Sequence, residues 1–236
     1  MSLTATTNFE AYSIATDGTD RIINSTLDHV QRPSGVAAAV LADTYHDSAL
    51  AKLWTSMICQ GFLEAGIDPL TGHVEGYLLH QASWAAAVAK LLDGEVAIDE
   101  LAETGASAGF AAVRISSAGS WEAYWAGGCR VAVFPEADVP LFRYCEDEQP
   151  FESPSLNSLL NTSLPLNSAS GQLDQDGVVV MVDSNSSNWL AASLRDDGVW
   201  ESEASLVGMV RKARHEGELS AAAINAILGR VTYHLF

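Results

Sequence analysis

Hydrophobic and polar positions change their period several times along the 236-residue chain, and each change marks a predicted element. Apolar and polar residues alternate over 9–16 (FEAYSIAT), and a short apolar run occupies 35–42 (GVAAAVLA), which predicts two strands. Apolar residues then recur at helical spacing over 46–65 and again over 76–92. The first third of the chain therefore predicts two strands followed by two helices, the second helix ending near Gly94.

The middle of the chain returns to an alternating pattern. Three alternating segments follow one another, separated by turn residues at 116–119 and by Gly127-Gly128. These strands are predicted over 107–116, 120–126 and 129–134. Two hairpins in a row predict an antiparallel meander.

The last third combines a polar segment with one strongly apolar run. Residues 152–176 are rich in Ser, Asn, Leu and Pro, which indicates a long surface segment with one helical turn near 156–160. The β-branched run at 177–182 (GVVVMV) predicts a buried strand. The predicted elements that follow are helices over 200–216 and 220–228 and a closing strand over 230–236.

Pairs of helices between groups of strands are not typical of alternating βαβ units, so a doubly wound parallel sheet is disfavoured. The order predicts an α+β fold, with two antiparallel sheets packed face to face and a helix pair outside each. No internal repeat or clear linker interrupts residues 1–236, which favours one domain.

Composition and charge exclude some classes of function. The chain has 12 Lys and Arg against 30 Asp and Glu, a formal net charge of −18. Nucleic-acid binding and docking on an anionic membrane are therefore not expected, because both need clustered basic residues. The acidic surplus fits either a well-solvated surface or carboxylates that bind a cation, and only their positions distinguish the two.

Cysteine and histidine spacing is also informative. The three cysteines, Cys59, Cys129 and Cys145, include no Cys-x-x-Cys pair, so neither a disulfide framework nor a thiolate zinc site is expected. The histidines show no metal-binding spacing. A reducing, cytoplasmic location fits best, because we find no signal-peptide pattern at the N-terminus and no apolar stretch long enough to span a membrane.

Two aspartates carry the strongest chemical signal. Asp43 and Asp183 each end an apolar run that is predicted to be a buried strand. A carboxylate in such a place needs a partner, since desolvating it alone costs several kcal/mol. Two of them at one edge would suit a hard divalent cation, whereas each alone would suit the N-cap of a following helix.

The arrangement of motifs resembles the metal-dependent type 2C protein phosphatases, in a divergent bacterial form. VLADTYHDSALAKLW resembles the Asp-Gly block of that family, with Asp43 in the metal-bridging position. VVVMVDSNSSNWL resembles its late Asp-Gly block, with Asp183 as the second metal ligand.

Weaker matches fall between and before these blocks, in the family's order. Residues 105–108 (GASA) resemble its Gly-Ser/Ala-Thr-Ala strand, and WEAYWAGGCRVAVF resembles the strands around its Gly-Asp-Ser-Arg motif. Arg21, Asn24 and Asp28 loosely resemble its early Arg…Asn-Glu-Asp segment. The resemblance covers nearly the whole chain.

The resemblance implies a four-layer α-β-β-α sandwich with two Mn²⁺ or Mg²⁺ ions in a cleft at one edge. Asp43, the Thr44 carbonyl and Asp183 would be the metal ligands, and a metal-activated water would attack a phosphoserine or phosphothreonine. Arg21 is the candidate for holding the phosphate, although it also fits an ordinary loop arginine.

Several positions depart from the family pattern. Thr44 replaces the Gly after the first metal Asp, and Gly128 replaces the Asp of Gly-Asp-Ser-Arg. The family's terminal acidic block is aligned with 229–232 (GRVT), so Gly229 lacks a ligand side chain and Arg230 adds a cation that would repel metal or pair with one of the two aspartates. Asp47 fits either a replacement ligand or a solvated helix face.

Three functional hypotheses follow from this pattern. The chain could be an active Mn²⁺- or Mg²⁺-dependent serine/threonine phosphoprotein phosphatase. It could instead be a catalytically dead phosphatase-like module that recognises a phosphoprotein or a partner subunit. A purely structural or oligomer-forming module is the third. The altered motifs favour the second over the first, and nothing in the sequence specifically supports the third.

Overall fold

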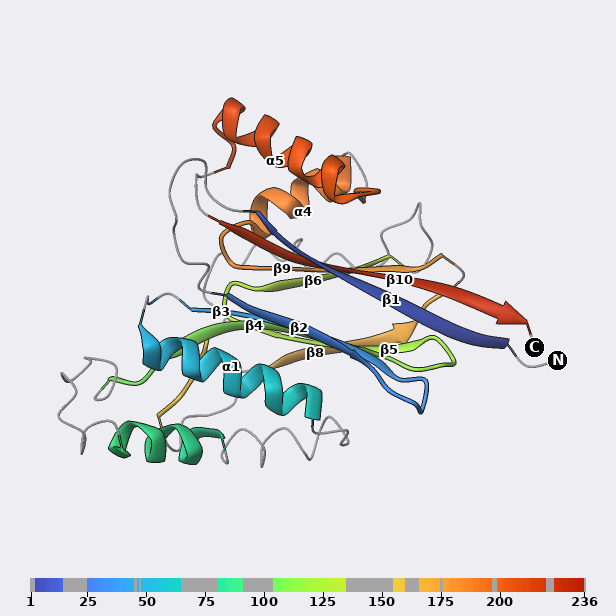
Figure 1. Ribbon diagram of the computed structural model, residues 1–236. Helices are drawn as coiled ribbons and strands as arrows, with labels where there is room; N and C mark the ends of the chain where they lie inside the picture. Colours follow the sequence, from blue (N-terminus) through green and yellow to red (C-terminus); the bar gives the residue numbers. More distant parts are fainter. Residues whose placement is uncertain are drawn as a thin grey trace.

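The computed structural model describes residues 3–14, 25–44, 46, 48–64, 80–90, 104–134, 155–159, 166–174, 176–196, 199–219 and 223–235. They form two antiparallel sheets packed face to face, with helices on both outer sides (Figure 1). This is the α+β sandwich that the sequence predicts.

The four-stranded sheet has the order β1-β10-β9-β6. Its strands are β1 (Leu3–Ile14), β10 (Ile224–Leu235), β9 (Val178–Val182) and β6 (Arg130–Phe134). The strand nearest the N-terminus pairs along its whole length with the strand nearest the C-terminus. Helices α4 (Ser187–Asp196) and α5 (Glu203–Glu216) cover the outer face of this sheet (Figure 1).

The second sheet has the order β2-β3-β4-β5-β8, with a short β7 paired to β4. Its strands are β2 (Ser25–Gln31), β3 (Ala37–Thr44), β4 (Ser107–Ile115), β5 (Ser120–Ala126), β7 (Leu156–Asn157) and β8 (Asn167–Gln172). Helix α1 (Ala49–Glu64) and a second helix over 80–90 cover its outer face (Figure 1).

Alternation along the strands divides the apolar residues into three layers. Between the sheets lie Leu41, Val113 and Met181, among others, and all three are fully buried. Trp121 and Trp125 also face this layer. The other faces of the same strands pack against the helices, which produces one apolar layer on each outer side.

The two tryptophans of the helix pair fix that pair on the second sheet. Trp54 and Trp84 are buried, and each indole N–H has a backbone acceptor. Trp54 Nε1 donates to the Leu156 carbonyl at 3.0 Å, and Trp84 Nε1 donates to the Leu50 carbonyl at 3.2 Å. A buried indole needs such a partner, so these bonds link α1 to β7 and the second helix to α1.

Several element predictions are wrong. Residues 224–228 lie in β10 instead of ending a helix, because the segment pairs with β1 on one side and β9 on the other. Part of 152–176 forms β7 and β8 instead of a loop. Strand β2 and helix α4 were not predicted.

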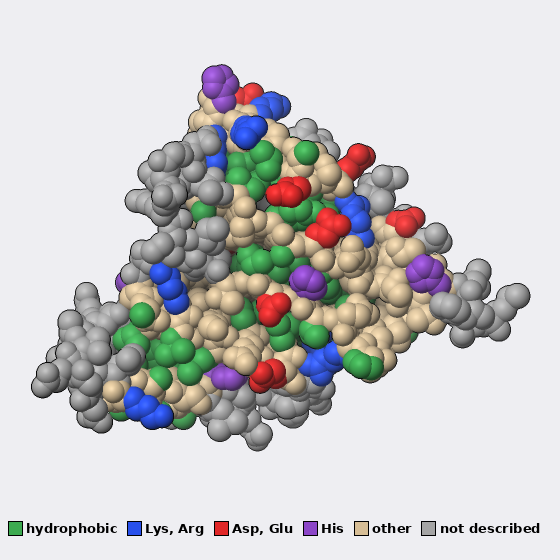
Figure 2. Space-filling model, in the orientation of Figure 1, with side chains coloured by type: hydrophobic (Ala, Val, Ile, Leu, Met, Phe, Trp, Pro, Cys, Tyr) green, Lys and Arg blue, Asp and Glu red, His purple; other side chains and the backbone are tan. Residues whose placement is uncertain are grey.

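Acidic side chains are dispersed over the face of the molecule that Figure 2 shows. On the face in Figure 2, the red Asp and Glu side chains stand singly among polar and apolar neighbours and do not gather in one patch. Among the described residues, no helix is long and apolar enough to cross a membrane. The charge therefore marks no binding surface on this face.

Candidate functional site

Asp43 and Asp183 come together at the edge where the two sheets meet. Asp43 is the second-last residue of β3, in one sheet, and Asp183 directly follows β9, in the other. Ser184 joins them, because it follows Asp183 in the chain and its backbone N–H donates to Asp43 Oδ2 at 2.8 Å. The structure thus brings together the two carboxylates that the sequence singles out.

The Asp183 carboxylate is fully buried and accepts hydrogen bonds on both oxygens. Oδ1 accepts from the backbone N–H of Ser186 at 3.1 Å and from its hydroxyl at 2.7 Å. Oδ2 accepts from the backbone N–H of Asn225 at 2.7 Å and from its side-chain amide at 3.0 Å. A carboxylate offers about four acceptor directions, and these four donors use them all.

Asp183 therefore holds two elements in place. The bonds to Ser186 close the turn that leads into α4, which is the capping role open to a strand-terminal Asp. The bonds to Asn225 fasten that turn to the start of β10, and the Asn225 carbonyl accepts in return from the Asp183 N–H at 3.1 Å. The Ser13 hydroxyl donates to Asn225 Oδ1 at 2.8 Å, which extends the network to β1.

Burial has a larger effect on the pKa of Asp183 than the hydrogen bonds that its carboxylate accepts. Desolvation raises the pKa of Asp183 to about 6, the donors from Ser186 and Asn225 oppose that rise, and the neighbouring charge of Asp43 adds to it.

Asp43 connects the two sheets through different partners. Its exposed fraction is 5%, and besides the Ser184 N–H on Oδ2 it accepts the thiol of Cys129 on Oδ1 at 3.4 Å. Burial, and next the charge of Asp43, raise the pKa of Cys129 well above its usual range, so this cysteine stays a protonated donor. Asp43 thus has two described hydrogen bonds, where Asp183 has four.

Glycines allow this cluster to close tightly. A Cβ on Gly109 would lie 2.3 Å from Asp43 Oδ1 and 2.9 Å from Cys129 Sγ, and one on Gly128 would lie 2.4 Å from the Ser184 hydroxyl oxygen. Gly128 therefore does lie at the site, where the resembled family has an acid, and the Ser184 side chain fills the space beside it.

The alternative that Asp43 caps the following helix is wrong. Helix α1 begins at Ala49, and its first turn is capped by Ser48, whose hydroxyl accepts from the Ala51 N–H at 3.1 Å. Thr44 is buried, and its hydroxyl exchanges hydrogen bonds with the backbone of His46 in the connection to α1. Asp43 is thus placed by β3 and held by the opposite sheet.

The sequence also singles out Arg21, Asn24, Asp28 and Asp47 as candidates. Arg21, Asn24 and Asp47 lie outside the described residues. Asp28 is exposed on β2. The site consists of the two predicted aspartates, the predicted Gly128 and other neighbours that the prediction did not include.

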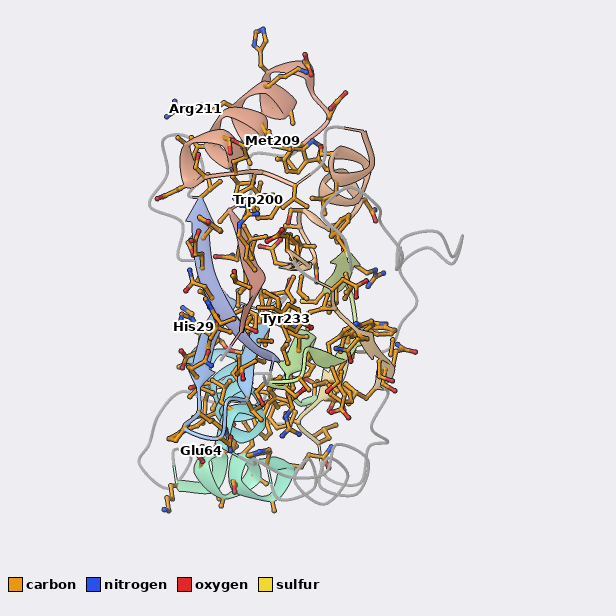
Figure 3. The ribbon with its side chains drawn as sticks, turned by 90° about the vertical axis from the view of Figure 1, so that its right-hand side faces the viewer. His29, Glu64, Trp200, Met209, Arg211 and Tyr233 are labelled. Atoms are coloured by element: carbon orange, nitrogen blue, oxygen red, sulfur yellow. The ribbon has the colours of Figure 1, made fainter. Side chains whose placement is uncertain are left out.

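Arg230 and Gly229 are not at the site, and the alignment of 229–232 with a terminal metal motif is wrong. Arg230 pairs with Val178, four residues from the Val182 end of β9, which is about 13 Å along the strand. Its Nη2 donates to the Trp200 carbonyl at 2.8 Å, and Trp200 lies beneath α5 (Figure 3). Gly229 faces the Phe9 ring. The structure therefore supports neither of the roles predicted for Arg230, which are repelling a metal ion and forming a salt bridge with Asp43 or Asp183.

The neighbours that sequence reasoning missed are Ser184, Ser186 and Asn225. Ser186 had a local signal, since Asp followed by Ser three residues later is the spacing of a side-chain cap. Asn225 had none, because it lies 42 residues further along the chain and meets Asp183 only through the β9–β10 pairing. The position of Asn225 beside Asp183 could be predicted only from the register of the sheet.

The described residues do not fit a two-metal centre. All acceptor directions of Asp183 are used by protein donors, so a cation would have to displace Ser186 or Asn225. Cys129 and Ser184 close in around Asp43. Within the described part of the chain, no three His, Cys, Asp or Glu side chains are grouped so that they could hold a metal ion.

Comparison with known proteins identifies the fold. No protein-family model matches the chain, and no curated protein matches it in sequence. Among solved structures, the S. agalactiae serine/threonine phosphatase superposes with a TM-score of 0.61 at 13% identity, covering 94% of this chain and 98% of its own. PppA, described as a key regulatory component of T6SS in Pseudomonas aeruginosa, superposes with a TM-score of 0.62 at 15% identity, covering 98% and 100%.

A third neighbour carries the metal that the resemblance implies. The catalytic domain of the serine threonine protein phosphatase PstP, solved with 2 manganese ions, superposes with a TM-score of 0.61 at 11% identity, covering 98% of this chain and 100% of that domain. At these identities the comparisons show the fold alone. The chain has the fold of bacterial PP2C-type serine/threonine phosphatases, as the motif order predicts.

Proposed function

We propose that this chain is a phosphatase-like module that recognises a phosphoprotein or a partner subunit and does not hydrolyse phosphate esters through a two-metal centre. The fold of its structural neighbours supports a role in the handling of phosphoproteins. The hydrogen bonds of the carboxylates support the loss of the metal centre.

One observation carries the proposal. Asp183, the second metal ligand by resemblance, gives all four acceptor directions to Ser186 and Asn225. Binding a cation there would break at least one buried hydrogen bond and leave its donor without a partner, at a cost of about 1–3 kcal/mol. In a two-metal hydrolase, by contrast, such a carboxylate is free to hold the ion that activates water.

The test is a calorimetric titration with Mn²⁺ together with hydrolysis of para-nitrophenyl phosphate. The variants are Asp43→Asn and Asp183→Asn, with Asp174→Asn as the matched control that removes an exposed carboxylate. We expect no saturable heat and no turnover above the enzyme-free rate in the unmodified chain. Saturable Mn²⁺ binding with turnover that both site variants lose and the control keeps would overturn the proposal and establish an active phosphatase.

A further inference from the structure

The connection between β5 and β6 crosses from one sheet to the other beside the two aspartates. Strand β5 belongs to the six-stranded sheet and β6 to the four-stranded one. Only Gly127, Gly128 and Cys129 lie between them. This short crossing places Arg130, the first residue of β6, opposite Val182, the last residue of β9.

Cys129 and Arg130 point to opposite faces of the four-stranded sheet. Cys129 belongs to the layer between the sheets, where its thiol donates to Asp43. Val131 of β6 shares that layer, whereas Phe134 packs in the layer beneath α4 and α5. Because side chains alternate along a strand, Arg130 lies on the outer face, whereas the Asp43 carboxylate lies on the inner one.

The crossing holds the Arg130 guanidinium in place. Its Nη1 donates to the Gly127 carbonyl at 2.8 Å and to the Cys129 carbonyl at 2.9 Å. The crossing itself is tightly packed, since a Cβ on Gly127 would lie 2.9 Å from the Gly109 Cα and one on Gly128 would lie 2.4 Å from the Ser184 hydroxyl oxygen. The carbonyls that fix the guanidinium are therefore themselves fixed.

Part of the guanidinium remains available. A guanidinium has five N–H donors, so those of Nε and Nη2 are left when Nη1 bonds to the two carbonyls. Among the described residues, the half-buried Arg130 side chain makes no further hydrogen bond and no ion pair. The chain has 30 Asp and Glu against 12 Lys and Arg, yet no described carboxylate compensates this cation. A partly desolvated charge favours an opposite charge beside it, which here would come from outside the described chain.

We propose that the free edge of Arg130 binds the phosphate of a phosphoserine or phosphothreonine side chain on a partner protein. The Nε and Nη2 donors lie side by side and match two phosphate oxygens in a bidentate contact. Because Nη1 is already held by the crossing, binding would cost little additional side-chain freedom.

A phosphate fits this edge better than a carboxylate does. A phosphate monoester has three free oxygens and a charge of about −2 at neutral pH, so it can use the donors of Nε and Nη2 more fully than a carboxylate can. The inference rests on the proposed function, because recognition of a phosphoprotein is what makes a phosphate the expected anion.

The test is fluorescence anisotropy with a fluorescein-labelled peptide, Ala-Ala-phosphoserine-Ala-Ala, in buffer with EDTA so that no metal ion supports hydrolysis. The unmodified chain should bind the peptide saturably. Arg130→Met should weaken binding at least about tenfold, because it removes both the fork and the charge. Arg130→Lys should weaken binding less, since a lysine keeps the charge but not the bidentate geometry.

The matched control is Arg211→Met, which removes an exposed arginine on α5 and should bind like the unmodified chain. Circular dichroism verifies that each variant is folded. If Arg130→Met does not fold, Arg130→Lys still tests the contact, because an ammonium can donate to the same carbonyls. The peptide with glutamate in place of phosphoserine should bind the unmodified chain at least about tenfold more weakly.

The inference would be overturned by the absence of saturable binding to the unmodified chain, or by folded Arg130 variants that bind as tightly as the unmodified chain. Equal binding of the glutamate peptide would also overturn it, since the site would then not recognise phosphate. Failure of the proposed function is seen separately, as turnover with Mn²⁺. A loss of peptide affinity in Arg130→Met would still assign phosphate binding to Arg130 in that case.

Discussion

Asp43 and Asp183 occupy equivalent positions in the two sheets, yet the protein uses them differently. Both end a buried strand and both are buried. Among the described residues, Asp183 accepts four hydrogen bonds from its own turn and from β10, whereas Asp43 accepts two, from the Ser184 N–H and the Cys129 thiol. The Asp183 carboxylate is fully used in hydrogen bonds that hold the fold. The Asp43 carboxylate links the two sheets and has fewer described hydrogen bonds.

This difference shows two ways in which a buried carboxylate can be held by protein donors. A buried carboxylate persists only if donors or a cation compensate its desolvation. In this chain protein donors provide that compensation, fully at Asp183 and partly at Asp43. The contrast predicts unequal responses when the two residues are changed.

The largest expected effect is the loss of the Asp183 carboxylate. Asp183→Ala should lower the free energy of unfolding by about 3–5 kcal/mol, because it leaves buried donors of Ser186 and Asn225 without an acceptor. Asp43→Ala should cost about 1–3 kcal/mol, since fewer donors depend on it. Urea unfolding of both variants measures the difference, and an equal cost would remove the distinction between the two carboxylates.

The fold could be predicted from sequence where the hydrophobic pattern is strong. The meander 107–134 and the run at 178–182 have clear alternation or strong β-branching, and they form the strands expected. Strand β8 has no apolar pattern, and it becomes a strand only by pairing with β5. Residues 224–228 were mistaken for helix because the sheet partners, which lie far away in sequence, decide the outcome.

Of the residues at the site, the sequence predicts the two aspartates and Gly128 but not the residues that bond to the carboxylates. An acid at the end of an apolar strand is visible in the sequence, so Asp43 and Asp183 were found. Arg230 was placed at the site because the register of β10 cannot be read from a motif, and Asn225 was missed for the same reason. Which partners saturate a carboxylate depends on contacts between distant segments.

The second expected effect is a pH dependence that belongs to Asp183. Its pKa is raised from 3.8 to about 6 in the folded chain, so the folded state holds a proton more tightly than the unfolded state. The stabilising contribution is therefore complete below about pH 4 and is lost as the pH rises through about 6. The unfolding free energy of the unmodified chain minus that of Asp183→Asn should be larger at pH 5 than at pH 7.

Asp43→Asn is the comparison for this pH effect. If the difference between the unmodified chain and Asp183→Asn is the same at pH 5 and pH 7, the raised pKa of Asp183 is wrong. The unfolding free energy of each variant is subtracted from that of the unmodified chain at the same pH. This subtraction cancels the contributions of the exposed carboxylates, since they are common to both proteins.

The third effect concerns the glycines that let the Asp43 cluster close. Gly109→Ala should lower the unfolding free energy by about 1–3 kcal/mol, because the new Cβ would lie 2.3 Å from Asp43 Oδ1. Gly208→Ala is the matched control, since Gly208 lies within α5 and its Cβ would meet no atom within 4 Å. That substitution should stabilise the chain by about 0.5–1 kcal/mol. Thermal unfolding should thus move the two variants in opposite directions.

The smallest effect is the coupling between the Cys129 thiol and each carboxylate. A double-mutant cycle of Cys129→Ala with Asp43→Asn should give a coupling energy of about 0.5–1 kcal/mol, because the thiol donates to Asp43 directly. The cycle with Asp183→Asn should give less than about 0.5 kcal/mol, since Cys129 feels Asp183 only through its charge. Equal coupling energies would mean that the Cys129 thiol interacts with the combined charge of Asp43 and Asp183. A larger coupling to Asp43 would mean that the Cys129–Asp43 bond itself ties the two sheets together at this edge.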